Sequence, residues 1–205
     1  LGKYARQEGM TFRLTPVENS AVNNDVSYRN IMEKFAYGKL NKNKPVYFDE
    51  ENRRRLNYIR LAHAQVAMGL AQAGRKEEAR KVLERFDENV NEKEFPYGMT
   101  SNRGNQHNAI ASQFLEACYL SEDIPLAKKV AASLKKDLNE QLKYYHSLGD
   151  EQMNEEQMVT TAYNMLQGKG GEMPSRQVSF AFDIVSSWQL LQQMENWEKN
   201  LAKAL

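Results

Sequence analysis

The chain has 205 residues, of which 27% are charged and 41% are hydrophobic, and its formal net charge is +1. This length can hold one sizeable hydrophobic core or a short stack of helical hairpins. The near-neutral charge argues against a nucleic-acid or membrane-surface binding protein, because those partners call for a clear excess of Lys and Arg. The single cysteine, Cys118, excludes an internal disulfide and a metal site built from cysteines alone.

The first part of the chain, residues 1–48, is predicted to hold an extended segment, a helix and a loop. Apolar and polar residues alternate over residues 11–16, which predicts an extended segment that ends at a proline. Ser27 is predicted to be the N-cap of a helix that stops at Gly38. A loop rich in Lys and Asn follows over residues 39–47.

The clearest pattern predicts two helical hairpins over residues 49–148. Asp49 is placed to cap a helix that Gly74 closes, and a second helix starts at Glu77. Two helices joined by so short a turn must pack antiparallel. The residues expected to face inward are Leu56, Ile59, Val66, Ala67, Leu70, Val82, Leu83 and Phe86.

The same pattern returns after a linker. Residues 105–120 are predicted to form a helix, residues 121–123 a turn, and Pro125 the start of another helix. Ala79 and Ala127 occupy matching places in the two hairpins, 48 residues apart. This spacing exceeds the 34-residue period of a regular tetratricopeptide array, and the excess lies in the linker.

Two closing helices are expected over residues 149–205. The first runs from about 150 to 167 and is broken by the glycines of residues 168–171. Ser175 is predicted to cap a long last helix that covers the open end of the stack. Its inward residues are expected to be Val178, Phe182, Val185, Trp188, Leu191, Met194 and Leu201. Residues 1–205 are thus predicted to be one helical domain.

The hairpins are interpreted as tetratricopeptide-like units, which need small residues where helices cross and large ones that wedge between them. In the first hairpin these residues are Ala67, Gly74, Ala79, Leu83 and Phe86, and in the second they are Leu115, Glu122, Ala127, Ala131 and Leu134. The second hairpin keeps the alanine and lacks the turn glycine. The predicted fold class is all-α, with antiparallel helical hairpins of this type and a long C-terminal capping helix; a generic helical bundle is the alternative.

No catalytic, metal or cofactor site is expected. The three histidines, His63, His107 and His146, fall on different predicted helices without the spacing that brings metal ligands onto one face. His63 lies where a tetratricopeptide unit usually places a large packing residue, which indicates a histidine of the core or of a groove. His63 and His107, together with Tyr144 and Tyr145, are the candidates to line a binding groove. A small helical hydrolase or lyase that uses His107 or His146 with a carboxylate remains the enzymatic alternative.

Several short segments resemble parts of a family of large bacterial membrane proteins. Residues 4–16 resemble the junction after the last membrane span, residues 28–35 and 46–52 resemble a helix and a segment that follow, and residues 74–79 and 95–97 also fit. The N-terminal half of that family is a domain of unknown function similar to protein O-mannosyltransferase-type enzymes that use lipid-linked sugars. The resemblance covers residues 1–148.

The resemblance implies a C-terminal extramembrane domain outside the sugar-transfer core, at the periplasmic face of the inner membrane. It carries no catalytic residue onto this chain, because the family's catalytic carboxylates lie in another part of the protein. The expected partner is a protein or peptide, or the parent protein's own membrane domain, with membrane attachment only through a part that precedes Leu1. A stand-alone adaptor that binds peptides, in the cytoplasm as the alternative location, is the second hypothesis.

Overall fold

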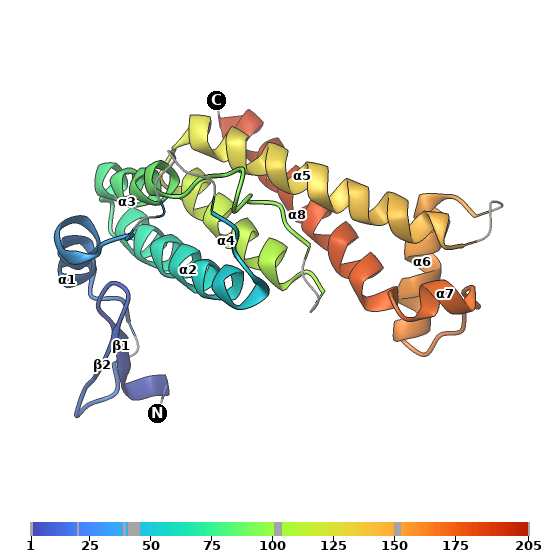
Figure 1. The fold of residues 1–205 in the computed structure, drawn as a ribbon, viewed down its shortest axis with the longest axis horizontal. Helices are drawn as coiled ribbons and strands as arrows, with labels where there is room; N and C mark the ends of the chain where they lie inside the picture. The colour runs from blue at the N-terminus through green and yellow to red at the C-terminus, as the bar shows by residue number, and fades with distance from the viewer. Residues whose placement is uncertain are drawn as a thin grey trace. The chain divides into compact units, whose positions relative to one another are not determined.

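The protein is mostly α-helical in the computed structural model, as the sequence predicts (Figure 1). The structure describes residues 2–19, 21–38, 40, 46–100, 104–149 and 153–204, with side chains up to residue 200. These residues form eight α-helices and a two-stranded sheet. They belong to two compact units, which we call unit 1 (residues 1–97 and 113–130) and unit 2 (residues 98–112 and 131–205).

Unit 1 begins with a small β-hairpin. A 3-10 turn, η1 (Gly2–Tyr4), leads into β1 (Ala5–Gln7), which pairs antiparallel with β2 (Phe12–Leu14) so that Ala5 lies opposite Leu14. The strand β2 confirms the extended segment predicted over residues 11–16. Its partner β1 was not predicted, because three residues give too short an alternating pattern to be noticed.

The next helix is capped by a different residue from the one predicted. Helix α1 (Asn24–Arg29) has Asn23 as its N-cap, and a π-helical turn, η2 (Asn30–Lys34), ends before Gly38. The prediction that Ser27 is the cap is wrong. Ser27 lies buried inside α1, where its hydroxyl accepts a hydrogen bond from the Gly9 N–H at 2.8 Å. Its side chain therefore satisfies a buried backbone donor of the β-hairpin connection.

The first predicted helical hairpin is present. Helix α2 (Glu50–Gln72) packs on α3 (Lys76–Asn89), and the Asp49 side chain accepts a hydrogen bond from the Asn52 N–H at 2.8 Å, as expected of an N-cap. The predicted inward stripe is buried, except that Ile59 is only half-buried. The fully or almost fully buried members are Leu56, Val66, Ala67, Leu70, Val82, Leu83 and Phe86.

The second hairpin reproduces the turn of the first. Helices α4 (Gln106–Leu120) and α5 (Ile124–Ser147) are joined at Glu122, whose φ of 60° matches the φ of 78° at Gly74. After each of these two residues, the following N–H donates a hydrogen bond of 2.9 Å to the carbonyl five residues earlier, from Arg75 to Leu70 and from Asp123 to Cys118. This is the Schellman ending of a helix, in which the left-handed residue is usually glycine. The second turn therefore has the same form as the first, although Glu122 takes the place of the glycine.

The turns of the two hairpins lie side by side in unit 1. Lys76 Nζ is 2.6 Å from a carboxylate oxygen of Glu122, which joins the two turns directly. Deeper in the unit, the rings of Phe86 and Phe114 are 5.5 Å apart between centroids. Ala79 and Ala127 are both completely buried. The two hairpins thus share an apolar seam here, as predicted.

Unit 2 contains the closing helices, and their boundaries differ from the predicted ones. Helix α6 (Glu155–Leu166) begins with a capping box at Asn154, several residues later than expected. Asp150, near which its start was predicted, lies outside the described residues. The helix ends before Gly168, which has a positive φ of 67°, so the predicted break is confirmed.

The single long helix predicted from Ser175 is two helices. The prediction that Ser175 is the cap is wrong: Pro174 is the N-cap, and Ser175 is the first residue of the short α7 (Ser175–Val178). Helix α8 (Ala181–Ala204) follows after a break. Val178, Phe182 and Trp188, expected to face inward, are between 41% and 69% exposed, so this part of the predicted stripe is wrong. Val185 and Met194 are buried as predicted, and the side chain of Leu201 lies outside the described residues. Helix α8 packs against α6; its capping of a helical stack stays a prediction.

Among the helices that the structure describes, none has a stretch both long and apolar enough to cross a bilayer.

Candidate docking groove

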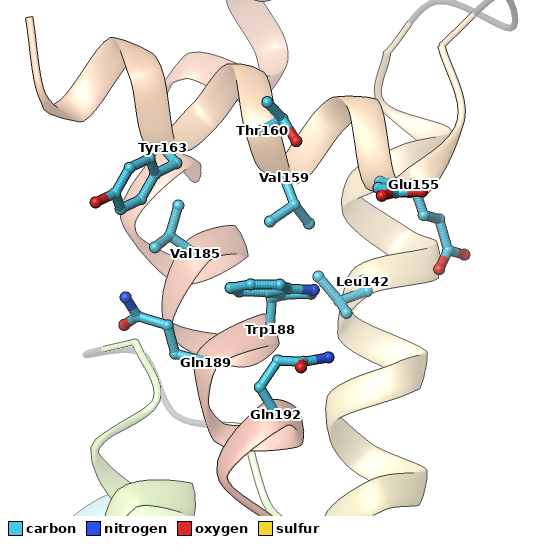
Figure 2. A pocket seen from close by; sticks show the side chains of 10 residues that line it. Leu142, Glu155, Val159, Thr160, Tyr163, Val185, Trp188, Gln189 and Gln192 are labelled. Carbon is cyan, nitrogen blue, oxygen red and sulfur yellow. The ribbon is translucent and has the colours of Figure 1, made fainter. Parts of the chain in front are cut away.

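An apolar groove of about 790 Å³ opens between helices α5, α6 and α8 of unit 2 (Figure 2). Its apolar lining comes from all three helices and consists of Leu142, Val159, Tyr163, Val185 and Trp188. In the close-up, the Trp188 ring lies across the groove, with Val159 reaching toward it from α6. The groove is therefore a surface feature to which three helices contribute.

Helical spacing explains why these side chains share one surface. On α6, Val159 and Tyr163 are four residues apart, and on α8, Val185 and Trp188 are three apart. Residues three or four apart lie on the same face of a helix. Neighbouring positions on the same helices hold Met158, Ala162 and Ile184, which are fully buried in the core of unit 2 together with Val159 and Val185. The residues that line the groove are therefore supported by a packed core beneath them.

Two aromatic side chains give the groove its exposed apolar surface. Trp188 is 41% exposed and Tyr163 is 43% exposed, whereas Leu142 and Val185 are buried at the base. Tyr and Trp offer a large apolar surface with a polar tip, and both are enriched among the residues that dominate protein–protein binding. An open groove with a buried aliphatic base and half-exposed aromatics fits an apolar segment of a partner.

The polar rim of the groove is acidic. Glu155 and Glu156, in the first turn of α6, line it together with neutral side chains, and no Lys or Arg is among its described lining residues. Neither glutamate forms an ion pair with any residue that the structure describes. The groove thus carries a formal charge of about −2 that the described part of the chain leaves uncompensated.

His63, one of the predicted groove residues, lies in the core of unit 1. It is completely buried on α2, where its Nδ1 donates a hydrogen bond of 2.8 Å to the Ile59 carbonyl and its Nε2 contacts the Tyr37 hydroxyl. Since Nδ1 carries the proton, Nε2 accepts from Tyr37. Burial lowers the pKa of His63 to about 4, so the ring is neutral at pH 7. It offers no surface to a ligand.

The other histidines do not form a site with it. His107 is 3% exposed near the start of α4, and Nε2 of His146, on α5, contacts the Met153 carbonyl oxygen. Within the described ranges, no group of three His, Cys, Asp or Glu side chains is arranged to hold a metal ion. Of the two histidines that the enzymatic alternative names, His107 is thus buried and His146 contacts a backbone carbonyl.

Tyr144 and Tyr145 belong to an aromatic cluster in unit 2. The Tyr145 ring stacks on Phe180 with centroids 5.0 Å apart, and Tyr144 lies 5.6 Å from Tyr145. Tyr144 is 55% exposed and Tyr145 is buried, and both line a smaller hollow of about 440 Å³ that also includes Asp137 and Asp183. Their role in binding stays a prediction.

The groove has no counterpart among the sequence predictions, although part of its signal is visible in the sequence. The periodicity predicts Trp188 on the inward stripe of the last helix, together with Val185. Tyr163 was not singled out. An aromatic pair on two neighbouring helices was the available indication, but only the pairing of α6 with α8 shows that the two rings share one groove.

Comparisons with family models, with curated proteins and with solved structures gave no match to this chain. The structure itself gives the class of protein: a mostly α-helical chain with an apolar surface groove in unit 2.

Proposed function

We propose that this chain is a non-catalytic interaction domain built from helical repeats, and that it docks a protein segment in the α5–α6–α8 groove. The observation that carries this proposal is the half-exposed Trp188 on a buried aliphatic base. Large aromatic residues in open apolar grooves are typical anchors for helical or extended peptides.

The repeat character is supported by the two matching hairpin turns. Their left-handed residues, Gly74 and Glu122, are 48 residues apart, as are the buried alanines Ala79 and Ala127. Matching turns and matching small residues are what stacked helix–turn–helix units need. We propose that the hairpins are tetratricopeptide-like units with a long linker between them.

We further propose that the chain is the C-terminal extramembrane part of a membrane glycosyltransferase-like protein, at the periplasmic face of the inner membrane. Besides the family resemblance, the exposed apolar face of the N-terminal β-hairpin supports a contact with a preceding part of such a protein. Phe12, Leu14 and Val17 are each about two-thirds exposed. A stand-alone peptide-binding adaptor is the alternative, and hydrophobic spans or a start codon directly upstream of the gene segment would distinguish the two.

The docking proposal is tested with a labelled amphipathic peptide whose apolar face is Leu and whose polar face is Gln, followed by fluorescence anisotropy. The double variant Trp188→Ala, Tyr163→Ala is expected to bind at least about tenfold more weakly, since central aromatic anchors contribute roughly 2 kcal/mol or more. Tyr47→Ala is the matched control, because Tyr47 is 84% exposed in unit 1. Equal binding by the double variant and the wild type would overturn the docking proposal.

The parent-protein proposal is tested in the full-length protein. Deletion of residues 1–205 is expected to change acceptor use or assembly of the enzyme, and the double groove variant is expected to reproduce part of that effect. Wild-type activity and assembly without these residues would refute a role for the domain in that parent.

A further inference from the structure

We infer that the groove binds a basic amphipathic helix, with apolar side chains on the α5–α6–α8 surface and Lys or Arg beside Glu155 and Glu156. This inference rests on the proposed docking function and adds the chemistry of the partner.

The charge of the groove is one-sided. Glu155 and Glu156 line it, and between Lys143 and Lys169 the sequence contains four acidic residues and no Lys or Arg. All of α6 lies within that stretch. The face that α6 turns to the groove is therefore acidic, with no positive side chain on the same helix to oppose it.

The helix dipole reduces this charge but does not cancel it. The N-terminal end of an α-helix is equivalent to roughly half a positive charge, and the two glutamates are in the first turn of α6. Two carboxylates against about half a charge leave the rim clearly negative. The dipole also stabilises α6 with both carboxylates unpaired, so folding does not require a cation beside them. Both carboxylates therefore stay free to pair with a cation of the partner.

The size of the apolar surface suits two turns of a helix. Its α8 wall runs from Val185 to Gln192, eight residues that rise about 12 Å along the axis. A docked helix covers this distance with apolar residues at positions i, i+3 or i+4, and i+7. Glu155 and Glu156 line the same groove, so a basic residue on the flank of the docked helix can lie beside them.

The same charge argues against a membrane as the occupant. Anionic lipid surfaces attract Lys and Arg and repel carboxylates. A groove with two glutamates and no basic lining residue among those described is repelled by such a surface, whereas a basic peptide is attracted. The partner is therefore a protein segment with apolar and positively charged faces.

The test uses three labelled peptides of identical length and Leu pattern, in which the polar positions nearest the apolar stripe are Lys, Gln or Glu. At low salt the Lys peptide is expected to bind about fivefold to tenfold more tightly than the Gln peptide, and the Glu peptide more weakly than either. The advantage of the Lys peptide is expected to shrink at 0.5 M NaCl, because exposed charges are screened.

Variants assign the effect to the two glutamates. The double variant E155Q, E156Q is expected to bind the Lys and Gln peptides equally, with the Gln peptide unchanged from wild type. Glu50→Gln with Glu172→Gln is the matched control, since both residues are exposed and lie outside the groove lining. The charge reversal E155K, E156K is expected to prefer the Glu peptide, which a general loss of structure would not produce.

The outcomes separate the two proposals. If all three peptides bind the wild type equally, or if E155Q, E156Q keeps the full preference for Lys, the inferred partner chemistry is wrong while docking stands. If none of the peptides binds, docking in this groove fails, and the inference fails with it. Binding to anionic vesicles in place of the Lys peptide would assign the groove to a lipid surface and would also overturn the inference.

Discussion

Arg60 is a buried cation that no described carboxylate neutralises. Its guanidinium lies 4.2 Å from the Phe95 ring centroid and 4.8 Å from that of Tyr97, and it donates a 2.9 Å hydrogen bond to the Pro96 carbonyl. Burial lowers the pKa of Arg60 to about 10, so the group stays charged at neutral pH. Cation–π contacts and carbonyl oxygens replace water around the charge. This one side chain fixes the segment that follows α3 against α2.

Replacing this cation should be costly. Arg60→Met is expected to lower the free energy of unfolding by about 3 kcal/mol, because it leaves the carbonyls of residues 95–97 without their donor in a buried site. Urea titration measures the change. Arg55→Met on the same helix is the control: its side chain is 72% exposed, so a change within about 0.5 kcal/mol is expected. Equal effects of the two substitutions would contradict the structural role of Arg60.

His63 should make the protein sensitive to acid. Its folded-state pKa of about 4 is below the ordinary value of 6.5, so between these values the unfolded chain binds more protons than the folded one. Stability attributable to His63 is therefore complete above pH 6.5 and is lost as the pH falls toward 4, by about 3 kcal/mol in all. Burial is the main cause, and the nearby charge of Arg85 adds to it.

Unfolding in urea at pH 7 and at pH 4.5 checks this dependence. His63→Gln is expected to reduce the loss of stability between the two pH values, since glutamine does not titrate. His146→Gln serves as the control, because His146 is only half-buried and lies in unit 2. If His63→Gln has the same pH slope as the wild type, the histidine is not the cause.

The two hairpin turns allow a direct comparison of backbone strain. Glu122 adopts a φ of 60°, which costs a residue with a Cβ roughly 1 kcal/mol. E122G and E122A both remove the ion pair with Lys76, so the difference between them isolates the backbone. We expect E122G to be the more stable by about 1 kcal/mol.

At the first turn, where glycine is already present, a substitution is expected to destabilise the protein. Gly74→Ala places a Cβ at a φ of 78° and should destabilise the protein by about 1 kcal/mol. Space is not the reason, because a Cβ at Gly74 would meet no atom within 4 Å. Thermal unfolding of G74A beside the two Glu122 variants measures both effects. A stabilised G74A would show that the turn is set by contacts and not by the left-handed backbone.

The sequence predicts well which segments are helical. It predicts less well where a helix begins or breaks and which of its side chains face inward. The stripe of α2 and α3 is strongly periodic and has a cap at Asp49 and a glycine at its end, so local chemistry and packing agree. Ser27 was misread because Asn23, four residues earlier, is an equally good cap, and only the tertiary bond to Gly9 decides between them. The break between α7 and α8 has no glycine to announce it.

The reactivity of Cys118 measures whether the protein stays folded. It is completely buried on α4, a helix that contributes residues to both compact units, and burial raises the pKa of its thiol well above the ordinary value. A buried, protonated thiol is a poor nucleophile. Reaction with a disulfide reagent should therefore require opening of the structure.

The labelling rate of Cys118 in native buffer is expected to be at least about 100-fold below that of the urea-unfolded chain. Arg60→Met should accelerate labelling in proportion to the stability it loses, about 100-fold for 3 kcal/mol, if labelling follows global unfolding. Rapid labelling of a chain with an unchanged circular dichroism spectrum would instead mean that α4 opens locally.

The candidate groove illustrates why a site is harder to predict than a fold. Each helix that lines it shows an amphipathic pattern, but Tyr163 and Trp188 are 25 residues apart and no local rule brings them together. The position of His63 in the hairpin, by contrast, predicts a histidine of the core or of a groove, and its burial against Tyr37 decides for the core. Long-range pairing of helices is what the linear pattern leaves open.

The left-handed bend at Glu122 also bears on how distant relatives of this chain can be found. A bend that forms although its own side chain disfavours it is imposed by the surrounding helices, so a related chain need not carry glycine at that point. A search profile that demands glycine at each bend would overlook such relatives. One that weighs the 48-residue interval between the two interior alanines, Ala79 and Ala127, would retain them.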